Sequence, residues 1–284
     1  MTLLVAECIG EFDYAGYRLE FTEYGSGDRA VVLLHGQLMP RRMHEPLARM
    51  LAGEGYHVYT LDLLGHGRSD KPTDPALYSM WAFGQQVVAF LDHLGVATAV
   101  VGGTSLGANT TLEVAAHAPE RLRGMVIEMP VLDNAVEAGI VAFAPLLFVA
   151  RAVPIAVTAV SRVAQAVPRS LVPFWSGIML DTVSQDPESM AAAIHGIFYG
   201  RVAPPHHERI AIDVPALVIG HRRDPIHPAA DAAMLADELV SCHFVEAKSF
   251  LEWRRRPERL NRETLAFLDA CWGVSSGLND AAGA

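Results

Sequence analysis

The run Gly103-Thr104-Ser105-Leu106-Gly107 is the part of the chain whose residue types and spacing point most directly to chemistry. It stands where an apolar run ends and a helical pattern begins. A G-x-S-x-G turn at such a junction lifts the serine side chain above the end of a strand, and the next helix directs its free N–H groups at the same place. Ser105 is our candidate nucleophile. The alternative is an ordinary glycine-rich turn between a strand and a helix.

A second segment, His35-Gly36-Gln37, follows the continuous apolar run Ala30-Val31-Val32-Leu33-Leu34. Glycine at this point allows a backbone N–H to approach the negative oxygen that develops when a carbonyl is attacked. We therefore predict that the N–H groups of Gln37 and Leu106 form the pair of oxyanion donors. For the His35 side chain we favour a structural role over a catalytic one.

Strands and helices alternate around these two segments. Residues 17–24 alternate apolar and polar side chains, as a half-solvated antiparallel strand does, whereas residues 30–34 suit a strand buried on both faces. Further strands are predicted at 57–61, 99–103, 124–128, 216–219 and 242–246, and helices at 43–52, 80–94, 106–117, 228–239 and 257–271. These repeated units indicate a mostly parallel, doubly wound α/β sheet with helices on both faces.

Residues 131–205 interrupt the alternation with helical material rich in Ala, Val, Pro, Phe and Met. An insertion of this length after the strand near 124–128 predicts a helical lid, which divides the core into residues 1–130 and 206–272. The last residues, 273–284, read as a flexible tail.

Within the insertion, residues 139–160 are very apolar, but Pro145, Arg151 and Pro154 interrupt them. A membrane-spanning helix needs about 20 apolar residues with few charges. We therefore expect a lid or core segment here and no stable membrane span.

Composition excludes several classes of protein. Of 284 residues, 51% are apolar and 19% charged, which is typical of a chain that forms a core. The net charge of −10 argues against a nucleic-acid partner, and we interpret the run Arg254-Arg255-Arg256 as a solvated face. The N-terminus lacks the pattern of a signal peptide. Three cysteines far apart, Cys8, Cys242 and Cys271, indicate a reduced protein, so we expect a cytoplasmic location.

Together these features resemble the α/β-hydrolase superfamily over residues from about 17 to 272. The run Gly65-His66-Gly67-Arg68-Ser69-Asp70 is similar to that family's structural loop after its fourth strand. Asp224, which follows the strand at 216–219, is similar to the family's catalytic acid. The alternative for Asp224 is a common turn residue before a proline.

The resemblance implies a serine hydrolase that needs no cofactor. Family members that are dehalogenases or epoxide hydrolases have aspartate at the position of Ser105, so a serine there indicates acyl transfer through an acyl-enzyme. We expect a small apolar carboxylic ester or thioester as substrate. The chain shows no sequence signature of its oligomeric state.

The family's chain order, Ser…Asp…His, puts the histidine in the loop after the last core strand. That loop carries Ser249-Phe250 where Gly-His is expected, and the chain has no histidine after His243. We therefore predict that Phe250 replaces the triad histidine, and we leave the general base unassigned. General-base catalysis contributes roughly 10²–10⁴-fold to the rate.

Other histidines are weak substitutes. His227 lies on the correct edge of the sheet, but we favour a surface histidine at a helix start. We favour exposed linker positions for His206 and His207, and a metal site there would need further ligands that the sequence does not place, so we expect no metal.

The position of Phe250 also motivates a rival function, a catalytically impaired hydrolase-fold protein that binds an apolar ligand. An aromatic ring in place of an imidazole makes the cleft more apolar. A third possibility, cofactor-free lyase or oxygenase chemistry on the same fold, has no positive sign in the sequence.

Overall fold

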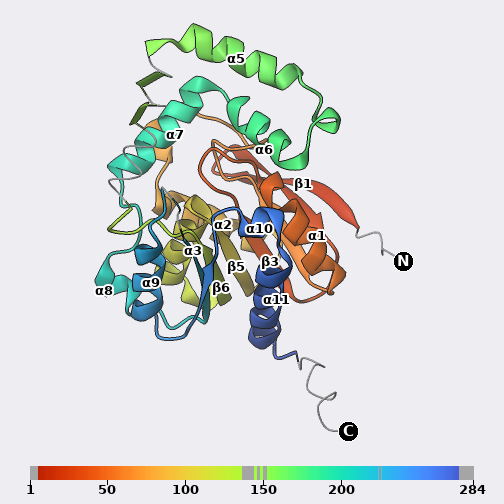
Figure 1. Ribbon diagram of the computed structural model, residues 1–284, viewed down its shortest axis with the longest axis vertical. Helices are drawn as coiled ribbons and strands as arrows, with labels where there is room; N and C mark the ends of the chain where they lie inside the picture. The colour runs from red at the N-terminus through yellow and green to blue at the C-terminus, as the bar shows by residue number, and fades with distance from the viewer. Residues whose placement is uncertain are drawn as a thin grey trace.

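The computed structural model contains an eight-stranded sheet with helices on both faces and a further group of helices beyond one end of it (Figure 1). The strand order is β1-β2-β4-β3-β5-β6-β7-β8. The pairs β1–β2 and β2–β4 are antiparallel, and the pairs from β4 to β8 are parallel. The structure describes residues 6–274 except 136–143, 146–147, 150–151, 223 and 225.

Each predicted strand and helix outside the insertion is present, with small differences at its ends. The strands are β1 (Glu7–Tyr14), β2 (Tyr17–Tyr24), β3 (Ala30–Leu34), β4 (His57–Leu61), β5 (Ala99–Thr104), β6 (Leu122–Glu128), β7 (Ala216–His221) and β8 (Cys242–Ala247). The helices that flank the sheet are α1 (Glu45–Gly53), α2 (Met80–His93), α3 (Leu106–His117), α8 (His206–Arg209), α9 (Ala229–Glu238), α10 (Glu252–Arg255) and α11 (Glu258–Trp272), and a 3-10 turn, η1 (Arg41–His44), precedes α1.

The central strands are buried on both faces, which confirms the predicted doubly wound sheet. All five residues of β3 are buried, as are all six of β5. One apolar layer joins the sheet to α2, α3 and α9 through residues such as Phe83, Leu112 and Leu235. A second layer joins the opposite face to α1 and α11 through residues such as Leu51 and Leu260.

Three longer helices, α5 (Pro154–Ala166), α6 (Phe174–Val183) and α7 (Pro187–Tyr199), lie between β6 and β7 in the chain and beyond one end of the sheet (Figure 1). Asn109 of α3 holds both ends of this insertion, because its Nδ2 donates to the carbonyl oxygens of Val131 (2.7 Å) and Val202 (2.6 Å). The division into core and lid stays a prediction. Of the predicted tail, residues 275–284 lie outside the described residues.

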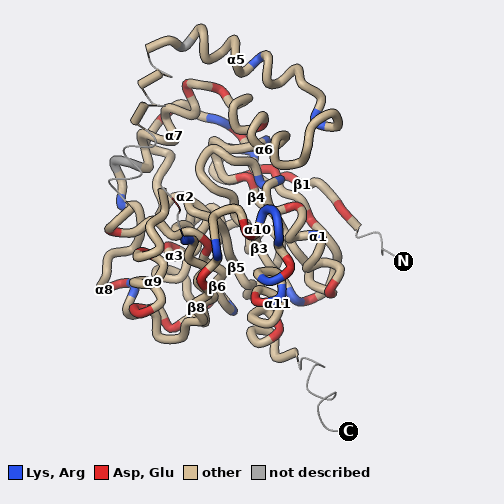
Figure 2. The backbone as a smooth tube through the Cα atoms, in the orientation of Figure 1, with Lys and Arg blue, Asp and Glu red and all other residues tan. Residues whose placement is uncertain are grey.

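Basic and acidic side chains are mixed along most of the chain, whereas α5 is almost free of both (Figure 2). Even so, none of the helices in the described ranges combines the length and the apolar character that crossing a bilayer requires.

Candidate active site

Ser105 occupies a sharp turn between β5 and α3. Its backbone angles, φ 54° and ψ −106°, are unfavourable for a residue with a side chain. The neighbouring chain leaves no room for larger residues, because a Cβ atom on Gly103 would lie 2.5 Å and one on Gly107 2.2 Å from the Leu34 carbonyl oxygen. The turn is therefore a nucleophile elbow in geometry as well as in sequence, and both glycines are needed to form it.

The imidazole of His227 lies between Ser105 and Asp224. Its Nε2 is 2.9 Å from the Ser105 Oγ, and its Nδ1 is 3.0 Å from the Asp224 Oδ2. A carboxylate accepts hydrogen bonds only, so Nδ1 carries the proton and its N–H donates a hydrogen bond to Asp224. Nε2 is then the acceptor for the Ser105 hydroxyl, which is the arrangement that a serine nucleophile and its general base require.

The turn after β7 brings Asp224 and His227 together. The Oδ1 of Asp224 accepts hydrogen bonds from the backbone N–H groups of Ile226 (2.8 Å) and His227 (3.0 Å), while its Oδ2 accepts from the imidazole. Burial raises the pKa of the Asp224 carboxyl, but these hydrogen bonds and the His227 ring outweigh it and lower the pKa below its ordinary value. Asp224 is thus an ionised carboxylate that orients His227.

The expectation that His227 is a surface histidine is wrong, since its side chain is only 14% exposed and bonds to Ser105. The order Ser…Asp…His is kept, but the histidine comes from the loop after β7 and not from the loop after β8. The three-residue spacing between Asp224 and His227 was the sequence signal that could have identified this histidine. An aspartate that accepts the N–H groups two and three residues later folds the third residue back onto its own carboxylate.

The remaining histidine candidates lie elsewhere. His206 and His207 are exposed on α8, and His206 pairs with Glu238 at 2.8 Å. His35 is buried, where its Nδ1 donates to the Gly36 carbonyl and its Nε2 accepts from the Leu63 N–H, as the structural role requires.

Phe250 is 42% exposed in the turn that follows β8. Its assignment to the family's histidine position stays a prediction. His227 already supplies an imidazole beside Ser105, so the site does not lack a histidine.

The Gln37 segment lies beside the elbow because β3 and β5 are neighbours, with Leu34 opposite Gly103. Leu106 is the first residue of α3, where an N–H has no acceptor within its own helix. The donor roles of Gln37 and Leu106 stay a proposal. The chain reverses direction around Gln37 in a tight turn, which the Met39 N–H closes by donating to the Gly36 carbonyl at 3.0 Å.

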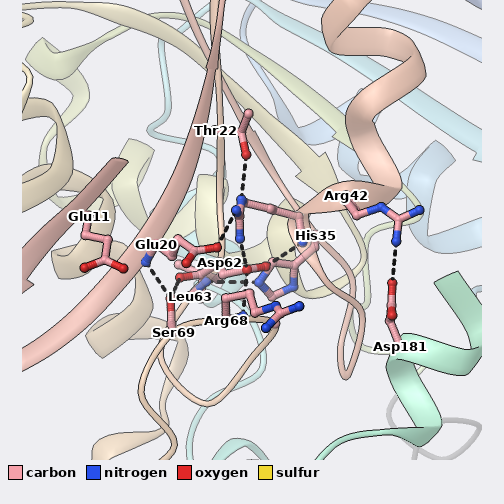
Figure 3. Close-up of polar contacts among 12 residues, drawn as sticks. Glu11, Glu20, Thr22, His35, Arg42, Asp62, Leu63, Arg68, Ser69 and Asp181 are labelled. Carbon is pink, nitrogen blue, oxygen red and sulfur yellow. Dashed lines mark hydrogen bonds and ion pairs between the residues drawn. The ribbon is translucent and has the colours of Figure 1, made fainter. Parts of the chain in front are cut away.

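A buried carboxylate, Asp62, joins the chain just after this segment to the run 65–70 (Figure 3). It accepts hydrogen bonds from the N–H groups of Arg41 (2.6 Å) and Arg68 (2.9 Å) and pairs with the Arg41 guanidinium. Ser69 also donates to the Asp62 carbonyl at 2.5 Å. These bonds give the run 65–70 the structural role that the resemblance implied.

A second buried carboxylate, Glu128, lies directly behind the elbow. Its side chain contacts the Arg254 guanidinium, the His221 Nε2 at 3.0 Å and the Thr104 hydroxyl at 2.5 Å, and its carbonyl accepts the Ser105 N–H at 2.9 Å. Arg254 is 14% exposed and paired, so reading it as part of a solvated face is wrong. The sequence held no signal that linked it to Glu128, 126 residues away.

Charge keeps this cluster ionised despite its burial. Burial alone would raise the pKa of the Glu128 carboxyl. Arg254 and His221 have the larger, opposite effect and hold that pKa well below its ordinary value. Burial lowers the pKa of His221, but Glu128 more than compensates and raises it. Within the described residues, no group of three or more His, Cys, Asp or Glu side chains has an arrangement that could hold a metal ion.

Comparison with known proteins identifies the family of the chain. Residues 29–249 match the family model for the alpha/beta hydrolase fold. 3-Oxoadipate enol-lactonase 2 of Acinetobacter baylyi is 26% identical over 78% of this chain and 82% of its own length. An epoxide hydrolase of Caballeronia sordidicola is 30% identical over 44% of this chain and 38% of its own length.

Among solved structures, the enol-lactonase from Burkholderia xenovorans has a TM-score of 0.74 at 23% identity and covers 91% of this chain and 99% of its own. At that identity the likeness concerns the fold. The family model spans most of the chain and includes the elbow and the Asp224–His227 turn. The chain therefore belongs to the alpha/beta hydrolase fold family.

Proposed function

We propose that the protein is a serine hydrolase that cleaves a small apolar carboxylic ester or thioester through an acyl-enzyme on Ser105. The single observation that carries the proposal is the continuous row Ser105–His227–Asp224, with hydrogen-bonding distances of 2.9 and 3.0 Å. A serine hydroxyl is a weak nucleophile until a positioned base accepts its proton. The relatives and the family match support an enzyme of the hydrolase class.

Each residue has a role in the proposed reaction. His227 Nε2 takes the Ser105 proton as Oγ attacks the substrate carbonyl, and Asp224 stabilises the imidazolium that forms. The N–H groups of Gln37 and Leu106 bind the negative carbonyl oxygen. When the tetrahedral intermediate collapses, its bond to the alcohol or thiol breaks and His227 protonates the leaving group. Water then attacks the acyl-enzyme by the same steps, releases the carboxylic acid and restores Ser105.

The relatives widen the substrate class to cyclic esters. Two proteins similar to this chain are named enol-lactonases, and a lactone is an intramolecular carboxylic ester that the same steps open. The epoxide hydrolase similarity is less informative, because this chain has serine where members of that branch form an ester on aspartate. We therefore propose carboxylic esters, lactones included, ahead of epoxides or haloalkanes.

The rival function, binding of an apolar ligand without catalysis, rested on a missing base. The position of His227 removes that support. The elbow strain at Ser105 argues in the same direction, because strained backbone is retained where it serves a function.

Hydrolysis of a panel of aryl esters, lactones and acyl thioesters tests the proposal, with wild-type protein and Ser105→Ala side by side. We expect turnover of at least one class by the wild type and its loss in Ser105→Ala. Turnover that survives Ser105→Ala would contradict the proposal. Saturable binding of the same compounds without any hydrolysis would establish the rival function.

A further inference from the structure

The segment that carries the proposed oxyanion donor Gln37 has an unfavourable backbone. Leu38 has φ 62°, in the left-handed region, whereas Gln37 is not among the residues with positive φ. Together with the hydrogen bond from Met39 N–H to Gly36 O, these angles define a type II turn with Leu38 at its third position. Glycine or asparagine is favoured at that position, and leucine is not.

The helical insertion supplies the contacts that compensate. The Leu38 side chain is 3% exposed and packs in a small apolar cluster with Met190, Ala191 and Ile194 of α7. The Leu38 carbonyl accepts a hydrogen bond from the side-chain Nε2 of Gln185, which lies between α6 and α7 and is 7% exposed. The turn is thus held from outside the core, by residues of the insertion.

One further contact fixes the insertion to the same part of the core, and another fixes Gln185 within the insertion. Arg42 follows the turn in the chain, and its guanidinium donates a hydrogen bond to Asp181 of α6 at 2.9 Å (Figure 3). The Ser161 hydroxyl of α5 donates to the Gln185 backbone carbonyl at 3.2 Å. Gln185 is therefore itself fixed in place, and its amide can act as a rigid clamp on Leu38.

We infer that Gln185 is a positioning residue for the oxyanion hole: by holding Leu38 in its strained conformation, it keeps the Gln37 N–H in place. The inference rests on the proposed function and adds to it that the hole is complete only while the 185–194 segment is docked on the turn. Oxyanion donors act over about 2.7–3.1 Å, so a small shift of the turn weakens them. Displacement of the segment would therefore slow catalysis without altering Ser105, His227 or Asp224.

Gln185→Leu removes the amide donor at similar volume, and Gln85→Leu is the matched control. Gln85 is a half-buried glutamine of α2, outside the helical insertion. We expect Gln185→Leu to lower kcat by roughly 10- to 100-fold with little change in KM, because misplaced catalytic groups cost about that much. Gln85→Leu is expected to leave kcat unchanged.

A double-mutant cycle separates positioning from simple loss of stability. Leu38→Gly removes the penalty of positive φ, so the turn depends less on the clamp. We expect the kcat loss from Gln185→Leu to shrink in the Leu38→Gly background. An equal loss in both backgrounds, or an unchanged kcat in Gln185→Leu, would overturn the inference.

Hydrogen exchange provides a readout that does not depend on turnover. We expect the Met39 amide, which closes the turn, to exchange about tenfold or more faster in Gln185→Leu and at the wild-type rate in Gln85→Leu. Unchanged exchange in Gln185→Leu would overturn the inference even if the protein is an active hydrolase. Faster exchange in a protein without Ser105-dependent turnover would reject the proposed function while leaving the clamp in place.

Discussion

The imidazole of His227 lies 2.9 Å from the hydroxyl of Ser105, across 122 residues of sequence. The elbow follows β5, and the Asp224–His227 turn follows β7, with β6 between them in the sheet. The histidine thus reaches over the end of β6 to the serine. The loop after β8, where the family's histidine is expected, leads into α10, which contributes Arg254 to the Glu128 cluster behind the elbow.

Replacing His227 tests its role as the base. His227→Gln is expected to reduce kcat/KM for the best substrate by at least 10²–10⁴-fold, because the side chain can no longer accept and return the Ser105 proton. His206→Gln is the control, since His206 is an exposed histidine paired with Glu238, and its steady-state kinetics should match the wild type. An active His227→Gln variant would show that another group serves as base.

Phe250→His distinguishes a missing base from a relocated one. If His227 is the base, it already accepts the Ser105 proton. A histidine at position 250 then adds nothing, and esterase activity should not rise. Initial rates on the best ester substrate measure this. A gain of tenfold or more, within the range that a general base contributes, would show that the site lacked a base and that Phe250 occupies its position.

The strained backbone at Ser105 predicts that the protein becomes more stable when this residue is replaced by glycine. Ser105→Gly and Ser105→Ala both remove the nucleophile, but only glycine relieves a backbone strain of about 1–3 kcal/mol. Glycine's larger entropy in the unfolded chain offsets about 0.5–1 kcal/mol of this. Thermal unfolding should therefore show Ser105→Gly to be more stable than Ser105→Ala. Equal midpoints, or a lower one for Ser105→Gly, would mean that the turn is not strained.

The Glu128 cluster should make stability depend on pH in a defined direction. The lowered pKa of Glu128 adds stability that is present above its ordinary value of 4.5 and is lost as the pH falls through the folded-state pKa. The raised pKa of His221 adds stability that is complete below 6.5 and is lost as the pH rises through the folded-state pKa. The cluster is therefore most stabilising between about pH 4.5 and 6.5.

Glu128→Gln leaves Arg254 nearly buried without its charge partner, which typically costs about 3–5 kcal/mol. Urea unfolding at pH 5.5 and at pH 9 should give a larger loss of unfolding free energy at the lower pH, because the His221 contribution is then also lost. In a His221→Asn background this difference between the two pH values should disappear. A loss that is the same at both pH values in the wild-type background would contradict the paired state of His221.

The sequence predicted the parts of the protein that depend on local patterns. The alternation of strands and helices follows from hydrophobic periodicity, and the elbow follows from small residues around Ser105 at a strand end. The Glu128–Arg254 pair could not be predicted, since it joins residues far apart in the chain through the order of the strands. His227 was misjudged because a helix start usually faces solvent, whereas here the Asp224 side chain turns it inward.

Fluorophosphonate labelling followed by intact mass and peptide mapping tests the central claim most directly, since the probe traps an activated serine. The wild type should take up a single label on Ser105, Ser105→Ala should take up none, and His227→Gln should react at least about 10²-fold more slowly. A known serine hydrolase labelled in parallel shows that the probe is reactive. An unlabelled wild type, or a His227→Gln variant that reacts as fast as the wild type, would contradict a Ser105 nucleophile activated by His227.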